Sequence, residues 1–262
     1  MTGYVPTQPQ AGSQVLSIPS SDWRDFLYEV GKGNIPGHAF VLAVGENDTI
    51  GNTFINLSDI GGTGSFATTG ETWDIVSTSA DDALGGIGAN VVVAINLDDG
   101  LLEITDAAFM NGTTPVTLPS TYLRSRLLVV GLSGSNMTNV GDITLQVSGG
   151  GTERAKILAG NGVNRGGAIT VQAGHTGFIV ETPVFTGRNN SVDAQFLSFS
   201  PNTNTINING MLPVTEGSAA LSSYPLGLPE KTDYWFRVKN DGGGTVFALG
   251  VISILEVDNN FL

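Results

Sequence analysis

Apolar and polar residues alternate with a period of two along most of the chain, which is typical of half-buried β-strands. The clearest case is residues 91–105, in which two alternating runs flank Asp98-Asp99-Gly100. In the first run the larger side chains stand at Val91, Val93, Ile95 and Leu97. Because Asp-Gly is a strong signal for a tight turn, this segment is predicted to form a β-hairpin.

Similar short runs recur every eight to twelve residues, separated by glycine-rich or Asn/Asp-rich turns. Strands are predicted at 39–44, 54–57, 72–78, 109–118, 122–130, 143–147, 154–158, 168–171, 177–184, 193–199, 205–209, 234–238 and 245–257. Turns are predicted at residues 45–48 and 242–244, and a loop at 212–229. In the 122–130 strand, Arg124 and Arg126 lie on one face of an otherwise apolar run.

The N-terminal residues break this pattern. Residues 1–19 contain Pro6, Pro9 and Pro19 and are expected to form an extended arm that lies on a neighbouring subunit or stays mobile. A short helix follows, capped by Asp22 and ended by Gly31, with an apolar stripe at i, i+3, i+4 and i+7. The stripe consists of Trp23, Phe26, Leu27 and Val30. Packing on the main sheet or on an adjacent subunit would both use this stripe.

Successive strands without alternating helices favour an all-β fold, a β-sandwich or jelly roll with an N-terminal arm and one short helix. The expected division is 1–34 for the arm and helix and 35–262 for the sandwich domain. An alternative division near residue 70 separates a small β subdomain from the main sandwich. No internal repeat aligns, which disfavours a propeller or solenoid.

Charge adds a second constraint. Only 13% of the 262 residues are charged, about half the usual share for soluble domains. The net charge is −13, and no Lys or Arg occurs between Gly33 and Leu123. A phosphate backbone would be repelled by this half, so nucleic acid is not expected as a direct partner. The uncharged polar surface suits a subunit of an assembly, although a secreted β protein would share it.

The absence of cysteine rules out disulfides and thiolate metal sites. No apolar run approaches the roughly 20 residues needed to span a bilayer, and the N-terminus lacks the basic and apolar regions of a signal peptide. We therefore expect no membrane association, and a protein that is made in a cytoplasm and kept there or released by lysis.

Candidate catalytic chemistry is sparse. His38 and His175 lie in predicted turns, far apart and without a serine or cysteine partner. The glycine-rich run 160–166 lacks the Lys-Ser/Thr of a phosphate-binding loop and no helix follows it, so a β-turn is the better interpretation. No carboxylate pair stands out for glycoside hydrolysis. No catalytic residue, enzyme activity or cofactor is predicted.

Calcium is the one ligand for which the chain offers weak candidates. These are the adjacent carboxylates Asp81 and Asp82, and Asp98 and Asp99. Neither pair has the spacing of an EF-hand loop. The alternative is a solvated acidic face that keeps the protein soluble or meets a basic partner.

Several short motifs, taken in order, resemble a family of virion proteins of tailed bacteriophages common in the sea, including cyanophages. They are residues 28–30 with 35–38, 45–48 with 50–54, 71–74, 79–82 leading to 86–90, 141–143, 173–178 and 229–235. The chain departs from the family at Gly45-Glu46-Asn47, where similar proteins often carry arginine, so no surface contact is carried over there.

This resemblance implies a non-enzymatic, oligomeric virion component assembled in the host cytoplasm. The leading hypothesis is a capsid decoration or cement protein, with trimers favoured, that binds other virion proteins such as the major capsid protein. Trp23, Phe26 and Tyr28 are the expected interface residues, with packing on their own domain as the alternative. The competing hypothesis is a tail, fibre or head-spike protein that binds a host receptor or glycan through residues 202–209 or 222–224. A secreted carbohydrate-active enzyme is disfavoured.

Overall fold

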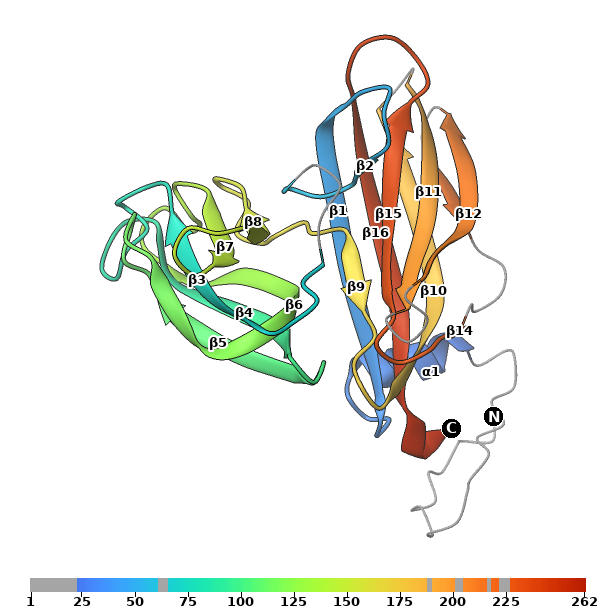
Figure 1. Ribbon diagram of the computed structural model, residues 1–262, viewed down its shortest axis with the longest axis horizontal. Helices are drawn as coiled ribbons and strands as arrows, with labels where there is room; N and C mark the ends of the chain where they lie inside the picture. Colours follow the sequence, from blue (N-terminus) through green and yellow to red (C-terminus); the bar gives the residue numbers. More distant parts are fainter. Residues whose placement is uncertain (1–22, 61–65, 188–189, 201–204, 216–217, 222–226) are drawn as a thin grey trace.

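The computed structural model describes residues 23–60, 66–187, 190–200, 205–215, 218–221 and 227–262. Their strands form three antiparallel sheets, two in an upright sandwich and one in a curled unit beside it (Figure 1). The predicted all-β fold is therefore confirmed, and so is the short helix, α1 (Trp23–Gly31). The predicted arm and Asp22 lie outside the described residues.

The sandwich consists of sheets A and B. Sheet A contains β1 (His38–Ile50), β16 (Val246–Asp258), β10 (His175–Thr186), β13 (Ser218–Leu221) and β14 (Gly227–Leu228). Sheet B contains β12 (Thr205–Thr215), β11 (Ser191–Ser200), β15 (Asp233–Asn240), β2 (Ile55–Asn56) and β9 (Ala168–Thr170). Their facing side chains, such as Ile252 of β16 and Phe236 of β15, form one buried core. A short 3-10 turn, η1 (Asn259–Phe261), follows β16.

Sheet C interrupts the sandwich in sequence. It runs in the order β5 (Glu103–Phe109), β4 (Ala89–Asp98), β6 (Val116–Ser133), β3 (Glu71–Ser77), β7 (Ile143–Val147) and β8 (Glu153–Ile157). A second buried core lies within its curl, around Trp73 and the stacked ring of Tyr122. The chain leaves the sandwich after β2 and returns at β9, so the sandwich is assembled from two separate stretches of sequence.

The turn predicted at residues 45–48 is wrong, because β1 continues through it to Ile50 and pairs with β16. Gly45 does not reverse the chain direction. It is needed because another stretch of backbone lies very close to it. A Cβ on Gly45 would lie 2.1 Å from the carbonyl oxygen of Leu57, where the chain passes over β1. Only glycine leaves room for that crossing.

The predicted hairpin is present as β4 and β5, joined at Asp98-Asp99-Gly100. The Asp98 carboxylate accepts hydrogen bonds from the N–H groups of Gly100 and Leu102, both at 2.9 Å. The most deeply buried face of β4 is the opposite of the one that carries the larger side chains. Val92, Ala94 and Asn96 are fully buried, whereas Val91, Val93 and Ile95 are only partly buried.

Asn96 gives a stability prediction. It is fully buried, and neither its amide nitrogen nor its oxygen has a hydrogen-bond partner among the described residues. Replacing it by leucine removes this desolvation cost and is expected to raise the free energy of unfolding by about 1–2 kcal/mol in urea titrations. The matched control is Asn90→Leu, because the Asn90 amide bonds Gly85, Gly86 and Gly88. If both variants lose stability equally, the buried Asn96 amide is satisfied in solution.

Candidate interaction sites

The sheet C unit is joined to the sandwich by buried ion pairs. Arg124 of β6 donates from Nε and Nη2 to the two carboxylate oxygens of Asp233 on β15, both at 2.8 Å. The arginine side chain is 8% exposed and that of Asp233 is 0% exposed. Arg124 also donates to the carbonyl of Ala67, and the hydroxyl of Thr170 donates to Asp233 at 2.6 Å. Both charges are therefore compensated and closely hydrogen-bonded.

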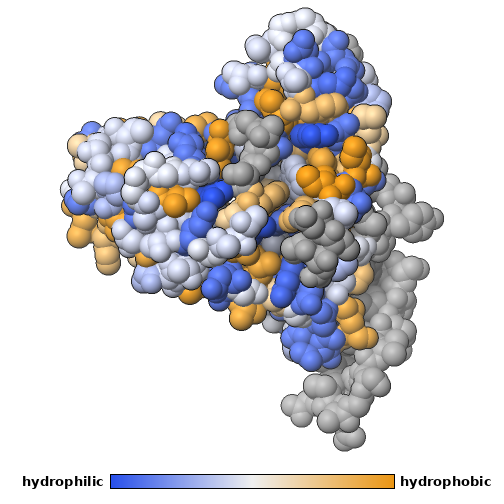
Figure 2. Space-filling model, in the orientation of Figure 1, coloured by the Kyte–Doolittle hydropathy of each residue, from blue (hydrophilic) through white to orange (hydrophobic). Residues whose placement is uncertain are grey.

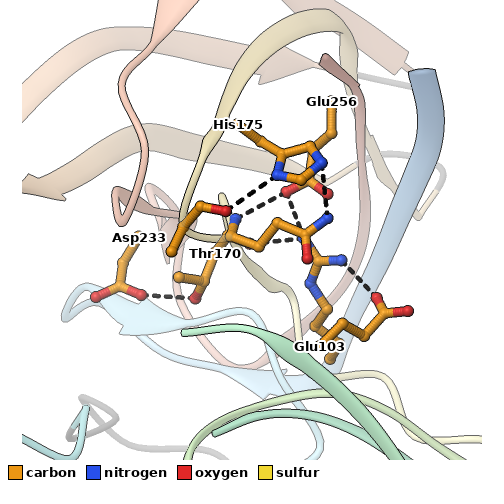
Figure 3. A network of polar contacts seen from close by, with 8 residues as sticks. Glu103, Thr170, His175, Asp233 and Glu256 are labelled. Carbon is orange, nitrogen blue, oxygen red and sulfur yellow. Dashed lines mark hydrogen bonds and ion pairs between the residues drawn. The ribbon is translucent and has the colours of Figure 1, made fainter. Parts of the chain in front are cut away.

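Arg126, two residues further along β6, makes a second connection (Figure 3). Its guanidinium pairs with the fully buried Glu256 of β16 and with Glu103 of β5, the latter at 2.7 Å. It also donates to the carbonyl oxygen of Thr170 at 2.9 Å. One arginine thus links sheet C to both sheets of the sandwich. Sequence patterning placed the two arginines on one face of a strand but contained no signal for their partners.

The two histidines begin different strands of the sandwich and contact different neighbours. His175 lies at the edge of this network, with Nδ1 at 3.1 Å from the carbonyl oxygen of Ala173 (Figure 3). His38 lies at the start of β1, where its ring meets the edge of Phe26 at 5.7 Å between centroids. The His38 ring also contacts Phe261 and the carbonyl oxygen of Pro36, and Nε2 of His175 lies 3.3 Å from the Gln172 side chain.

A cavity of about 650 Å³ lies between sheet C and the sandwich. Four arginines line it, and each pairs with a carboxylate: Arg124 with Asp233, Arg126 with Glu256, Arg154 with Glu71, and Arg165 with Glu46. Its remaining walls are largely apolar, with Leu42, Phe66 and Leu123 among them. The positive charge of the lining is therefore neutralised by the protein itself.

Asp59 lies beside this cavity's Arg165. The backbone N–H of Arg165 donates to the Asp59 carboxylate at 2.8 Å. Burial nevertheless raises the pKa of Asp59 from 3.8 to about 6, because the hydrogen bond and charge of Arg165 offset the desolvation only in part. The folded protein therefore holds this proton more tightly than the unfolded chain does.

This raised pKa predicts a pH dependence of stability. The contribution of Asp59 is fully present below pH 3.8 and is lost as the pH rises through about 6. Asp59→Asn keeps an oxygen for Arg165 and removes the titration. At pH 8 this variant is expected to be more stable than the native protein by about 1 kcal/mol, a figure discounted for solvent screening. Urea titrations at pH 5 and pH 8 measure the difference, and equal pH slopes for both proteins would contradict it.

The calcium candidates are not brought together. Asp82 is fully buried and its carboxylate accepts four hydrogen bonds, from the hydroxyl of Ser77 and the N–H groups of Ala89, Val140 and Gly141, at 2.6–2.8 Å. Asp81 is exposed beside it. Asp98 and Asp99 lie at the other end of β4, in the hairpin turn. Over the ranges that the structure describes, no three His, Asp or Glu side chains are grouped as metal ligands.

The end of sheet C remote from the sandwich is apolar and exposed. The hairpin end of β4 contacts the sandwich, where the N–H of Ala173 donates to the carbonyl of Leu101. The opposite end, on the left in Figure 1, carries five exposed apolar side chains. Apolar groups interrupt the hydrophilic surface of this unit in Figure 2. We call this set the apolar tip; it consists of Leu84 (64% exposed), Ile87 (51%), Phe109 (64%), Leu132 (57%) and Met137 (87%).

Strand pairing and hydrogen bonds hold the backbone of the apolar tip in place. Phe109 and Leu132 stand in register on either side of Val91, on neighbouring strands. The buried side chains of Asp82 and Asn90 form hydrogen bonds with the backbone of the loop that carries Leu84 and Ile87. The sequence marks this loop only by motifs 79–82 and 86–90, which resemble virion proteins, and shows no signal for its exposed apolar side chains.

The three predicted interface residues, Trp23, Phe26 and Tyr28, have different outcomes in the structure. Phe26 packs with Val30 against Leu255 and Val257 of β16, on its own domain. Tyr28 is 64% exposed and carries the Lys32 ammonium at 4.1 Å from its ring centroid. The backbone of Trp23 begins α1, but its side chain lies outside the described residues. Of the two members whose side chains the structure describes, Tyr28 faces solvent and Phe26 is partly buried.

Comparisons with known proteins give little. No protein-family model matches the chain, and no curated protein matches it. A chain in the structure of infectious bursal disease virus Gt strain is 12% identical over 88% of this chain and 77% of its own length, with a TM-score of 0.20. A chain in the 2.6 Å structure of infectious bursal virus derived T=1 particles is 12% identical over 90% and 75%, with a TM-score of 0.23. Scores this low carry no conclusion about role.

The structure also bears on the stretches proposed for receptor binding and on membrane-spanning helices. Of the stretch 202–209 proposed for receptor binding, residues 205–209 belong to β12 and not to a loop, and residues 202–204 and 222–224 lie outside the described residues. The nine-residue α1 is much shorter than a bilayer is thick, and none of the helices in the described ranges is long and apolar enough to cross a membrane.

Proposed function

We propose that the chain is a non-enzymatic structural protein of a bacteriophage virion, acting as a decoration or cement protein on the head. The observation that carries this proposal is the apolar tip, at the end of sheet C remote from the contact with the sandwich. The ordered motifs that resemble marine phage virion proteins support the same assignment. The binding would depend on burial of apolar surface, without chemistry on a substrate.

The tip has the properties of a binding surface. A loop whose backbone is already fixed loses little backbone conformational entropy when a partner covers it. A few residues near the centre of an interface provide most of its binding energy. Two buried polar side chains, Asp82 and Asn90, hold the loop in which Leu84 and Ile87 are exposed.

The proposed partner of the tip is an apolar groove on the major capsid protein. A homo-oligomer, with the trimer favoured, would present several tips to the shell at once and multiply a modest affinity. Exposed Tyr28 on α1 is a further proposed contact between subunits. The acidic stretch 33–123, which has no lysine or arginine, would lie on the outside of the shell without contact with the packaged genome.

Charged substitutions in the tip test the proposal. Ile87→Asp and Leu84→Asp are expected to weaken binding to heads that lack this protein by about tenfold or more, as loss of an apolar anchor does. The matched control is Leu102→Asp, because Leu102 is 54% exposed at the opposite end of β4. Sedimentation of the variants with purified heads measures the difference.

Two results would contradict the proposal. The first is equal binding to heads by the tip variants, the control variant and the native protein. The other is binding of the purified protein to intact host cells but not to heads, which would favour a receptor-binding tail or spike protein. Measurable cleavage of a glycan would overturn the non-enzymatic assignment itself.

A further inference from the structure

Among the described strands, β12 is the outermost strand of sheet B and pairs with β11 on one side. From Thr205 to Asn209 every side chain is exposed. Ile206 is 62% exposed, Ile208 59% and Met211 60%. An outermost strand presents unpaired backbone N–H and C=O groups, so it is a template for another strand.

Other long outermost strands are protected by charge, and β12 is not. β5 carries Glu103 and Asp106, β8 carries Glu153, Arg154 and Lys156, and β1 ends in Glu46 and Asp48 beside an irregularity in its register. Natural proteins use such charges and bulges to prevent pairing at sheet edges. The eleven residues of β12 include no charged side chain, and no other described strand of that length lacks one.

The isoleucines of β12 lie on the face of sheet B that points away from the sandwich core. Ile208 pairs with Leu197, and Leu197 pairs with Trp235, whereas the next residues, Phe196 and Phe236, belong to the core. Residues directly opposite one another across strands share a face. An apolar row therefore runs across sheet B and ends at the exposed Ile208.

We infer that β12 pairs antiparallel with β12 of a second copy of this chain, across a twofold axis. A chain of net charge −13 repels its own copies, so a charge-free edge is where self-pairing is least opposed. The alternation Ile206, Asn207, Ile208, Asn209 is also self-complementary, because isoleucine packs on isoleucine and an amide both donates and accepts hydrogen bonds. The register of β12 on β11 shifts at Asn209, and Pro213 beyond the shift has no N–H to donate, so we place the axis within Ile206–Ile208.

This inference goes beyond the proposed function and does not depend on it. A twofold contact between β12 strands uses a different surface from the apolar tip and from Tyr28 of α1. A twofold contact is also distinct from the threefold contact of a trimer, and the two together would give a dimer of trimers.

A cysteine scan tests the pairing, since the native chain has no cysteine. Thr205→Cys, Ile206→Cys, Asn207→Cys and Ile208→Cys are oxidised mildly and separated without reductant. Residues that face themselves across a twofold axis lie within disulfide distance. We expect covalent dimers to peak at one or two neighbouring positions. Ala107→Cys on the exposed, charged edge strand β5 is the control and should give few.

Solution mass provides the second measurement. Analytical ultracentrifugation of the native chain should show a β12-dependent association, and Ile208→Lys should raise its dissociation constant by at least about tenfold. Ile208→Thr introduces an uncharged residue that favours strands, so its dissociation constant should stay closer to that of the native chain than the constant of Ile208→Lys does. Circular dichroism checks that both variants fold. Equal association of Ile208→Lys and the native chain, or cross-linking no stronger than that of the β5 control, would overturn the inference. Absence of the protein from virions would leave it standing.

Discussion

Replacing Arg124 by methionine is expected to lower the free energy of unfolding by about 3–5 kcal/mol, the usual cost of removing one partner of a buried ion pair. The cause is Asp233, whose fully buried carboxylate would keep only the hydroxyl of Thr170 as a side-chain partner. Because total stabilities are about 5–15 kcal/mol, this single change removes a large share. Urea titrations followed by far-UV circular dichroism measure it.

Two variants separate charge burial from loss of packing. The double variant Arg124→Met, Asp233→Leu removes both charges and should recover most of the stability, since an apolar pair has no desolvation cost. Lys32→Met breaks the exposed ion pair with Glu29 and should leave the free energy of unfolding nearly unchanged. If the double variant is less stable than Arg124→Met alone, the buried pair itself, and not the orphaned carboxylate, stabilises the contact between the two units.

Asp82→Ala is the second change with a large expected effect, about 3–5 kcal/mol, because it leaves three backbone N–H groups and a hydroxyl without their acceptor. It should also loosen the loop that carries Leu84 and Ile87 and so weaken binding through the apolar tip. Hydrogen exchange at the N–H groups of Val140 and Gly141 should accelerate strongly.

The neighbouring carboxylate is the control for this prediction. Asp81 is exposed, and Asp81→Ala should change stability by no more than about 0.5 kcal/mol. Asp82→Asn keeps one oxygen, which can still accept from Ala89 and Val140, so its loss should be intermediate. Unchanged exchange at Gly141 in Asp82→Ala would show that this carboxylate does not fix the loop.

Features set by local sequence could be predicted. The apolar spacing of Phe26 and Val30 identifies α1, and Asp98-Asp99-Gly100 identifies the β4–β5 hairpin, because turn and helix signals act over a few residues. Gly45 shows the limit of such signals. Glycine marks turns and also close crossings, and only the position of Leu57 reveals that this one belongs to a crossing.

Features set by distant contacts could not be predicted. Arg124 and Asp233 are 109 residues apart, and Arg126 and Glu256 are 130 apart, so no local pattern links them. The insertion of sheet C between β2 and β9 has the same cause, because strands on either side of it pair with one another across the insertion. Asp82 was singled out as a possible calcium ligand, but its carboxylate binds the backbone of a loop about 60 residues away.

The most direct test of the virion assignment is absolute quantification of this chain in purified particles of the virus that encodes it, by mass spectrometry against the major capsid subunit. The proposal predicts a copy number of the same order as that of the capsid subunit, retained after the tails are removed. A copy number equal to that of the tail proteins would contradict it. So would presence of the protein in the lysate but not in the particles.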